Sequence, residues 1–144
     1  DGTLSLAIGL SVAHGATVLV TGDLALLHDS NGWLLASSCR PPLVVLLIDN
    51  AGGGIFHQLG TETVSKDLFD ELFLMPQKVD QLGLVASHQI ASRDVFSLED
   101  LSDALDWALE LSEPVLIRLT TDSNYDAILR KNLRKGLQDF LSSF

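Results

Sequence analysis

A continuous apolar run, Leu43–Ile48, is followed by Asp49, Asn50 and three consecutive glycines, Gly52–Gly54. An unbroken run of this length, rich in Val, Leu and Ile, is typical of a strand buried on both faces of a parallel sheet. Parallel strands need crossover connections, usually helices. The run therefore predicts an α/β fold, and the glycines permit a close backbone approach just beyond the strand.

A second run, Thr17–Gly22, ends in the same way, with Asp23 directly after it. The order strand, helix, strand implies a right-handed crossover between two parallel strands. Ligands of α/β sheets bind at the carboxyl ends of the strands. We therefore expect Asp23 and Asn50 to lie side by side at that edge of the sheet.

The rest of the chain alternates between helical and extended patterns, which predicts a mostly parallel sheet with helices on both faces. Ser97, with Asp100 three residues on, is a near match to a capping box. The expected elements, besides the two strands, are a helix over 1–15, a helix capped by Ser30 or Asn31 and running through Cys39, a loop and short helix within Thr61–Leu74, a helix over Val79–Ser87, a short strand over His88–Ala91, a helix over Leu98–Leu111, a strand over Val115–Thr120 and a terminal helix over Asp122–Phe144.

Size and charge exclude several classes of function. The 144 residues suit a single domain, and the net charge of −10 argues against nucleic acid and anionic membranes as partners. No apolar run approaches the ~20 residues of a membrane-spanning helix. The mean hydropathy of +0.29 fits either a sheet covered on both faces or apolar patches that meet a partner domain or subunit. Any bound phosphate must therefore be met by a metal, by backbone amides or by a helix terminus, and not by a lysine cluster.

The single cysteine, Cys39, excludes an internal disulfide and fits a reducing cytoplasm. We expect it to be a small buried apolar residue instead of a nucleophile. The chain starts Asp1-Gly2-Thr3, with no initiator Met and no basic leader. This start suggests that residues 1–144 are a piece of a longer protein.

The paired strand ends carry ligands that suit magnesium. Mg²⁺ prefers hard oxygen ligands in an octahedron, few of them from protein. Asp23 offers a carboxylate, Asn50 an amide oxygen and Gly52 a backbone carbonyl. Diphosphate oxygens and water would complete the shell, and the amides around 22–24 and 52–54 would contact the remaining phosphate oxygens.

Other site types have weaker support. The four histidines lack metal-ligand spacing, which argues against zinc. Neither a nucleophile elbow nor the dinucleotide fingerprint is present. An unrelated α/β phosphate-binding domain, such as a receiver or phosphatase, stays open and would use an aspartate nucleophile.

The spacing Gly22-Asp23, about 27 residues, then Asn50 resembles the diphosphate-binding motif of thiamine diphosphate enzymes. Three strings resemble one member family in particular, 2-succinyl-5-enolpyruvyl-6-hydroxy-3-cyclohexene-1-carboxylate synthase, an enzyme of menaquinone and phylloquinone synthesis. They are Gly22-Asp23-Leu24, Leu27-His28-Asp29-Ser30-Asn31-Gly32 and Asp49-Asn50-Ala51-Gly52-Gly53-Gly54-Ile55-Phe56. The start at Asp1-Gly2 and the later Phe73-Leu74-Met75-Pro76-Gln77 fit as well.

The resemblance implies that the chain is the diphosphate-binding domain of a thiamine diphosphate-dependent transferase. The metal, Mg²⁺ with Mn²⁺ as a substitute, would be held by Asp23, Asn50 and Gly52. The implied cofactor-binding residues are Gly22, Asp23, Leu24, Asn50, Gly52 and Gly53. The implied substrate-pocket residues are Ile55, Phe56 and Leu59, for which core packing is the alternative.

The family reaction decarboxylates 2-oxoglutarate on the cofactor and adds the four-carbon unit to isochorismate. The glutamate that activates the cofactor belongs to a different, N-terminal domain, so residues 1–144 contain no catalytic residue and we expect them to be inactive alone. The implied partner is the pyrimidine-binding domain of a neighbouring subunit in a cytoplasmic homo-oligomer.

Two positions depart from the family pattern: Asp49 and Ala51 stand where Asn is frequent. Another thiamine diphosphate decarboxylase or synthase, or a non-catalytic assembly domain of the same fold, stays as an alternative.

Overall fold

The computed structural model describes residues 2–59 and 64–143. By their internal contacts, these residues form two compact units. Unit 1 consists of the described residues within 1–49 and 77–120, and unit 2 of those within 50–76 and 121–144.

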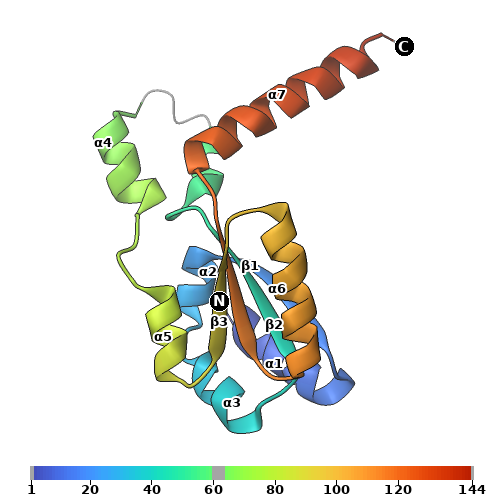
Figure 1. The fold of residues 1–144 in the computed structure, drawn as a ribbon. Coiled ribbons are helices and arrows are strands. Elements are labelled where there is room, and N and C mark those ends of the chain that lie inside the picture. The colour runs from blue at the N-terminus through green and yellow to red at the C-terminus, as the bar shows by residue number, and fades with distance from the viewer. Residues whose placement is uncertain (1, 60–63, 144) are drawn as a thin grey trace. The chain divides into compact units, whose positions relative to one another are not determined.

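Unit 1 is built on a four-stranded parallel sheet (Figure 1). Its strands are β1 (Thr17–Gly22), β2 (Leu43–Asp49), β3 (Ala91–Val95) and β4 (Val115–Thr120), in the order β1-β2-β4-β3. All three pairs are parallel, and Gly22 of β1 lies opposite Ile48 of β2. The expected α/β fold with a parallel sheet is confirmed.

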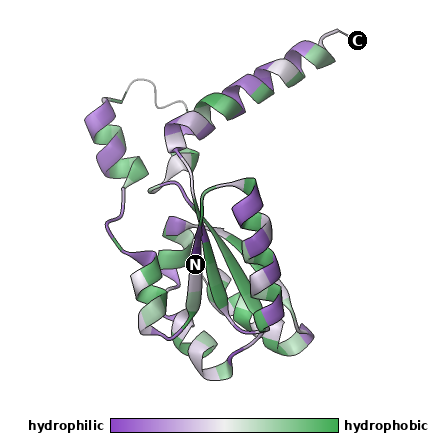
Figure 2. Ribbon diagram, viewed as in Figure 1, coloured by the Kyte–Doolittle hydropathy of each residue, from purple (hydrophilic) through white to green (hydrophobic). Residues whose placement is uncertain are grey.

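Helices cover both faces of this sheet. The elements α1 (Thr3–His14), α2 (Asp23–His28), α3 (Gly32–Cys39) and α5 (Gln81–Ser87) share one core with the sheet, around the fully buried Trp33. On the opposite face, α6 (Leu98–Leu111) packs Ala104 and Ala108 against Val44, Val115 and Ile117. The strand β2 is strongly hydrophobic, β3 is largely hydrophilic, and hydrophilic and hydrophobic residues alternate along α6 (Figure 2).

The start of α6 shows the expected capping. The Asp100 backbone N–H donates to Ser97 Oγ at 3.0 Å, and the Phe96 N–H donates to Asp100 Oδ2 at 3.2 Å.

The prediction that a side chain caps the start of α3 is wrong. The N-cap residue Asn31 has αR geometry and makes no side-chain cap hydrogen bond, because a tight turn after α2 already bonds the first N–H groups of α3 to backbone carbonyls.

Two further expectations in unit 1 are wrong. The strand predicted over His88–Ala91 begins only at Ala91, because the preceding residues close α5: the Ile90 N–H donates to Val85 O at 3.1 Å, and Gln89 has a φ of 60°. The second concerns Cys39, which is exposed instead of buried because α3 ends there, one turn beyond the buried Ala36.

The helix α2 was not predicted from the sequence as a separate element.

Unit 2 consists of short helical pieces and one long helix. The chain forms a 3₁₀ turn, η1 (Gly54–Gln58), then α4 (Lys66–Phe69), which continues as a π turn, η2 (Asp70–Leu74). The short helix expected within Thr61–Leu74 is confirmed, whereas residues 61–63 of that segment lie outside the described part. Phe69 and Phe73 stack with ring centroids 5.7 Å apart.

The terminal helix α7 (Ser123–Leu141) is confirmed, but it leaves its apolar positions exposed. Its N-cap, Asp122, accepts hydrogen bonds from the backbone N–H groups of Asn124 and Tyr125, both at 2.9 Å. The apolar side chains with large exposure are Tyr125, Ile128, Leu129, Leu133, Leu137, Phe140 and Leu141. Among the described residues, no helix is both long and apolar enough to span a bilayer.

Candidate functional site

Asp23 stands at the carboxyl end of β1, where it is the first residue of α2. Its side chain is buried, with 4% of its surface exposed. The Leu24 N–H donates to Asp23 Oδ1 at 2.9 Å, and Gln81 Nε2 donates to the Asp23 carbonyl at 3.4 Å. An oxygen ligand is thus held in a fixed position next to the exposed backbone of Gly22.

Asp49, the last residue of β2, lies beside a cation on the neighbouring strand. Arg118 of β4 donates to both carboxylate oxygens of Asp94, at 2.6 and 2.8 Å, and its Nη1 lies 3.9 Å from Asp49 Oδ2. The hydrogen bonds to Asp94, and the nearby negative charges of Asp94, Asp49 and Asp80, raise the pKa of Arg118. Asp49, which stands where Asn is expected, therefore shares one cation with Asp94, and Asp94 makes the shorter contacts to it.

Asn50 opens unit 2 and directly follows β2 in the chain. Its Oδ1 is buried and has no hydrogen-bond partner in the described parts of the chain. A buried acceptor without a donor is costly unless something else, such as a cation, meets it. The Asn50 amide therefore provides an oxygen ligand that nothing described here uses.

The glycines after Asn50 are required by close backbone contacts. A Cβ on Gly52, whose φ is 131°, would lie 2.0 Å from Leu74 O, and a Cβ on Gly53 would lie 2.3 Å from Phe73 O. The Gly53 N–H donates to Leu74 O at 2.6 Å. No side chain fits between these two segments, so residues 52–54 present a bare backbone.

A small pocket of about 150 Å³ joins the residues after β2 to the start of α7. Asn50, Gly54 and Ile55 form one side, and Ser123, Asp126 and Arg130 of α7 are on the other. Ser123, Asp126 and Arg130 were not among the site residues predicted from the sequence. Polar residues directly follow the strand Val115–Thr120, just as Asp23 and Asn50 follow the other two strands. That pattern could have indicated a third segment at the site.

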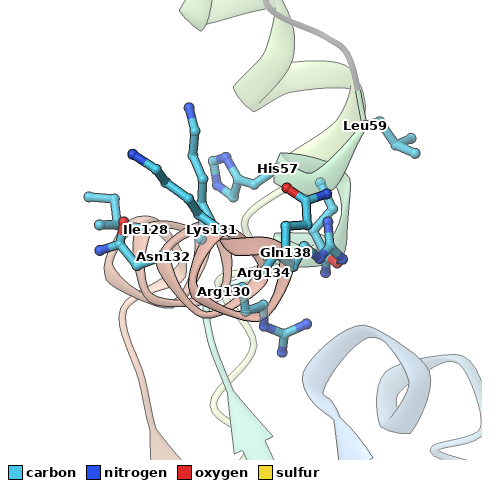
Figure 3. Close-up of a pocket in the computed structure, with 11 residues that line it drawn as sticks. His57, Leu59, Ile128, Arg130, Lys131, Asn132, Arg134 and Gln138 are labelled. Carbon is cyan, nitrogen blue, oxygen red and sulfur yellow. The ribbon is translucent and has the colours of Figure 1, made fainter. Parts of the chain in front are cut away.

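The three expected substrate-pocket residues differ in their surroundings. Ile55 and Leu59 are 66% and 54% exposed, so neither is packed in a core. Phe56 is half-buried and makes an edge contact with Phe73, with centroids 5.7 Å apart. Ile55 lines the small pocket with Asn50, whereas Leu59 lines a larger cavity of about 770 Å³ along α7 (Figure 3).

The available donors are hard oxygens: the Asp23 carboxylate, the Asn50 amide and main-chain carbonyls. Within residues 2–59 and 64–143, no group of three or more His, Cys, Asp or Glu side chains could hold a metal. A cation that takes few protein ligands and completes its shell with phosphate oxygens and water fits this set, and Mg²⁺ behaves in this way.

Comparisons with known proteins identify the family of this chain. The sequence pattern of the family "Thiamine pyrophosphate enzyme, C-terminal TPP binding domain" matches residues 2–119. A 2-succinyl-5-enolpyruvyl-6-hydroxy-3-cyclohexene-1-carboxylate synthase from Synechococcus sp. (strain CC9311) is 61% identical over 138 residues, covering 96% of this chain and 24% of the relative. A synthase of the same name from Prochlorococcus marinus (strain MIT 9313) is 57% identical, covering 99% of this chain and 25% of the relative. The chain thus spans about a quarter of the length of these relatives.

Solved structures share the fold. The thiamine diphosphate-dependent 4-hydroxybenzoylformate decarboxylase of Rhodococcus jostii RHA1 superposes with a TM-score of 0.73 at 20% identity, covering 83% of this chain and 23% of that chain. Benzoylformate decarboxylase from Polynucleobacter necessarius superposes with a TM-score of 0.67 at 18% identity, covering 84% of this chain and 23% of that one. At this identity the likeness shows the fold alone. The family match and the identity to the synthases together show that the chain belongs to the thiamine pyrophosphate enzymes, as a C-terminal TPP-binding domain.

Proposed function

We propose that residues 1–144 act as one diphosphate- and Mg²⁺-binding domain of a longer, multidomain synthase. That enzyme decarboxylates 2-oxoglutarate and adds the resulting four-carbon unit to isochorismate. The single observation that carries this proposal is the 61% identity to a synthase of this name over 96% of the chain. Several features follow from the proposal: a cytoplasmic homo-oligomer, a pyrimidine-binding domain supplied by a neighbouring subunit, and an activating glutamate in an N-terminal domain.

Asp23, Asn50 and the Gly52 carbonyl would hold the metal, with Mn²⁺ able to replace Mg²⁺. Burial of Asp23 and the unpartnered Oδ1 of Asn50 support these roles. The pairing of the strands supports them too, because Gly22 of β1 lies opposite Ile48 of β2. Asp23 comes one residue after Gly22, and Asn50 comes two residues after Ile48. Gly22, Leu24 and Gly53 would lie beside the diphosphate, although the N–H groups of Leu24 and Gly53 donate to Asp23 Oδ1 and Leu74 O in this structure.

When bound, thiamine diphosphate supplies a thiazolium carbon that acts as nucleophile and electron sink. The chain's own contribution is position and environment. Ile55 and Phe56 would border the reacting carbon and exclude water from it. Arg118, which Asp49 shares with Asp94, would offset part of the negative charge of these two carboxylates.

The test is calorimetric titration of the full-length protein with thiamine diphosphate in Mg²⁺ buffer. Asp23→Ala and Asn50→Ala should each weaken binding about tenfold or more, because each removes a ligand to a buried cation. Asp103→Ala is the matched control, since Asp103 is an exposed carboxylate of α6. It should bind as the unmodified protein does.

Two results would contradict the proposal. Absence of binding by the unmodified full-length protein would leave a non-catalytic assembly domain of this fold. Binding that Asp23→Ala leaves intact would remove the proposed ligand set. A third measurement, product formation from 2-oxoglutarate and isochorismate, separates this synthase from other thiamine diphosphate decarboxylases.

A further inference from the structure

The cavity along α7 has a distinctive charge. Four of the chain's nine Lys and Arg residues line it: Arg130, Lys131, Arg134 and Lys135. The chain has 19 acidic residues, yet the lining contains none of them. Its volume of about 770 Å³ lies within the range of small-molecule sites, roughly 300–1,000 Å³.

The spacing of these like charges lowers the stability of α7. Arg130 and Arg134, like Lys131 and Lys135, are four residues apart, and like charges at this spacing destabilise a helix by a few tenths of a kcal/mol. In the described parts of the chain, the salt bridges involve Arg40 and Arg118 and none of these four cations. The cluster therefore has no anionic partner of its own there.

The wall opposite α7 adds oriented polar groups. His57 of η1 tilts its ring against Phe69, with centroids 4.8 Å apart, and its Nε2 is buried without a partner among the described residues. Figure 3 shows the His57 ring on the side of α7 from which Lys131 extends, with Arg130 pointing to the other side. Arg134 donates to Gln58 Oε1, which holds its guanidinium at the cavity.

We propose that this cavity binds small organic anions that carry two or more carboxylates, with Lys131, Lys135 and Arg134 meeting the carboxylates and His57 Nε2 completing the site. Both substrates of the proposed function, 2-oxoglutarate and isochorismate, belong to this class, so the ligand's identity rests on that proposal. Leu59, an expected substrate-pocket residue, lines the same cavity. In a chain of net charge −10, a local cation cluster also raises the concentration of anionic substrate beside the site.

The test uses the full-length protein freed of thiamine diphosphate and Mg²⁺, so that binding at the cofactor does not contribute. The probe is 2-oxoglutarate, titrated by calorimetry at low ionic strength. Lys131→Gln/Lys135→Gln should raise the Kd about four- to twenty-five-fold, since each exposed cation–carboxylate contact contributes a factor of roughly two to five. His57→Phe, which keeps a ring against Phe69, should also weaken binding.

The matched control is Lys66→Gln/Lys78→Gln, which changes the net charge equally at two lysines outside the cavity. Its Kd should stay within about twofold of the unmodified value, because long-range charge is screened by salt. As a second control, 2-oxobutanoate has a single carboxylate. It should bind more weakly and respond less to the substitutions in the cavity.

Equal effects of the two double substitutions would overturn the proposal, because general electrostatics and not the cavity would then be responsible. No binding of 2-oxoglutarate to the cofactor-free protein would overturn it as well. Thiamine diphosphate affinity, measured on the same variants, reports the proposed function separately. If the protein binds the cofactor but does not bind the dicarboxylate in this cavity, the proposed function stands and only the dicarboxylate site is refuted.

Discussion

Gly52 shows how a single residue decides whether the segment after β2 can take its observed course. Its φ of 131° is strained for any residue with a side chain, and an added Cβ would lie 2.0 Å from the backbone oxygen of Leu74. We expect Gly52→Ala to lower the free energy of unfolding by about 1–3 kcal/mol, because backbone strain and a clash with a main-chain atom act together. Urea denaturation of the full-length protein measures this change.

Gly136 is the matched control for that substitution. It lies inside α7, and a Cβ there would have no heavy atom within 4 Å. Gly136→Ala should therefore stabilise the protein, by up to about 1 kcal/mol, through helix propensity alone. Equal effects of the two substitutions would show that the contact between Gly52 and Leu74 does not constrain the backbone.

At the scale of the element, the two predicted helix starts provide an internal comparison. Ser97 accepts a hydrogen bond from the Asp100 N–H, whereas Asn31 makes no side-chain cap bond. Ser97→Ala should cost about 1 kcal/mol of stability, and Asn31→Ala should cost close to nothing, because only the first leaves a helix N–H unpaired. Thermal denaturation compares the two directly, and a larger loss from Asn31→Ala would contradict the observed caps.

The terminal helix carries two faces that differ in chemistry. Its cations line the cavity along η1, while its apolar side chains, such as Leu133 and Leu137, are more than half exposed in the described structure. Helices in proteins gain most of their stability from burying the apolar side of an amphipathic helix, and α7 does not bury these side chains in the described structure. The family pattern ends at residue 119, whereas the match to a synthase relative covers 99% of the chain and so includes the sequence of α7.

At the scale of the whole molecule, the chain spans about a quarter of the length of its synthase relatives. We expect purified residues 1–144 to form no product from 2-oxoglutarate and isochorismate, because the proposed pyrimidine-binding half of the site is supplied from elsewhere. Cofactor affinity should also be lower than in the full-length protein, since the rings would stay in water. Turnover assays and calorimetry on the two forms test this, and synthase activity from residues 1–144 would refute it.

Most of the fold was predictable because its signals are local. The apolar run Leu43–Ile48 and the Ser97 cap depend on residues adjacent in sequence, and both are found where expected. The errors occurred where local signals compete with tertiary contacts. The residues His88–Ile90 have strand-like composition, but their backbone hydrogen bonds serve to close α5.

The sequence by itself determined the parallel α/β fold and the family, because continuous apolar runs, short motifs and the spacing of Asp23 and Asn50 are properties of the linear chain. Only the tertiary structure decided the surroundings of those residues. It placed Arg118 beside Asp49, left Asn50 Oδ1 buried without a partner, and gathered the cations of α7 with His57 around one cavity. Such contacts join residues tens of positions apart, and their geometry depends on how elements pack, which no local pattern encodes.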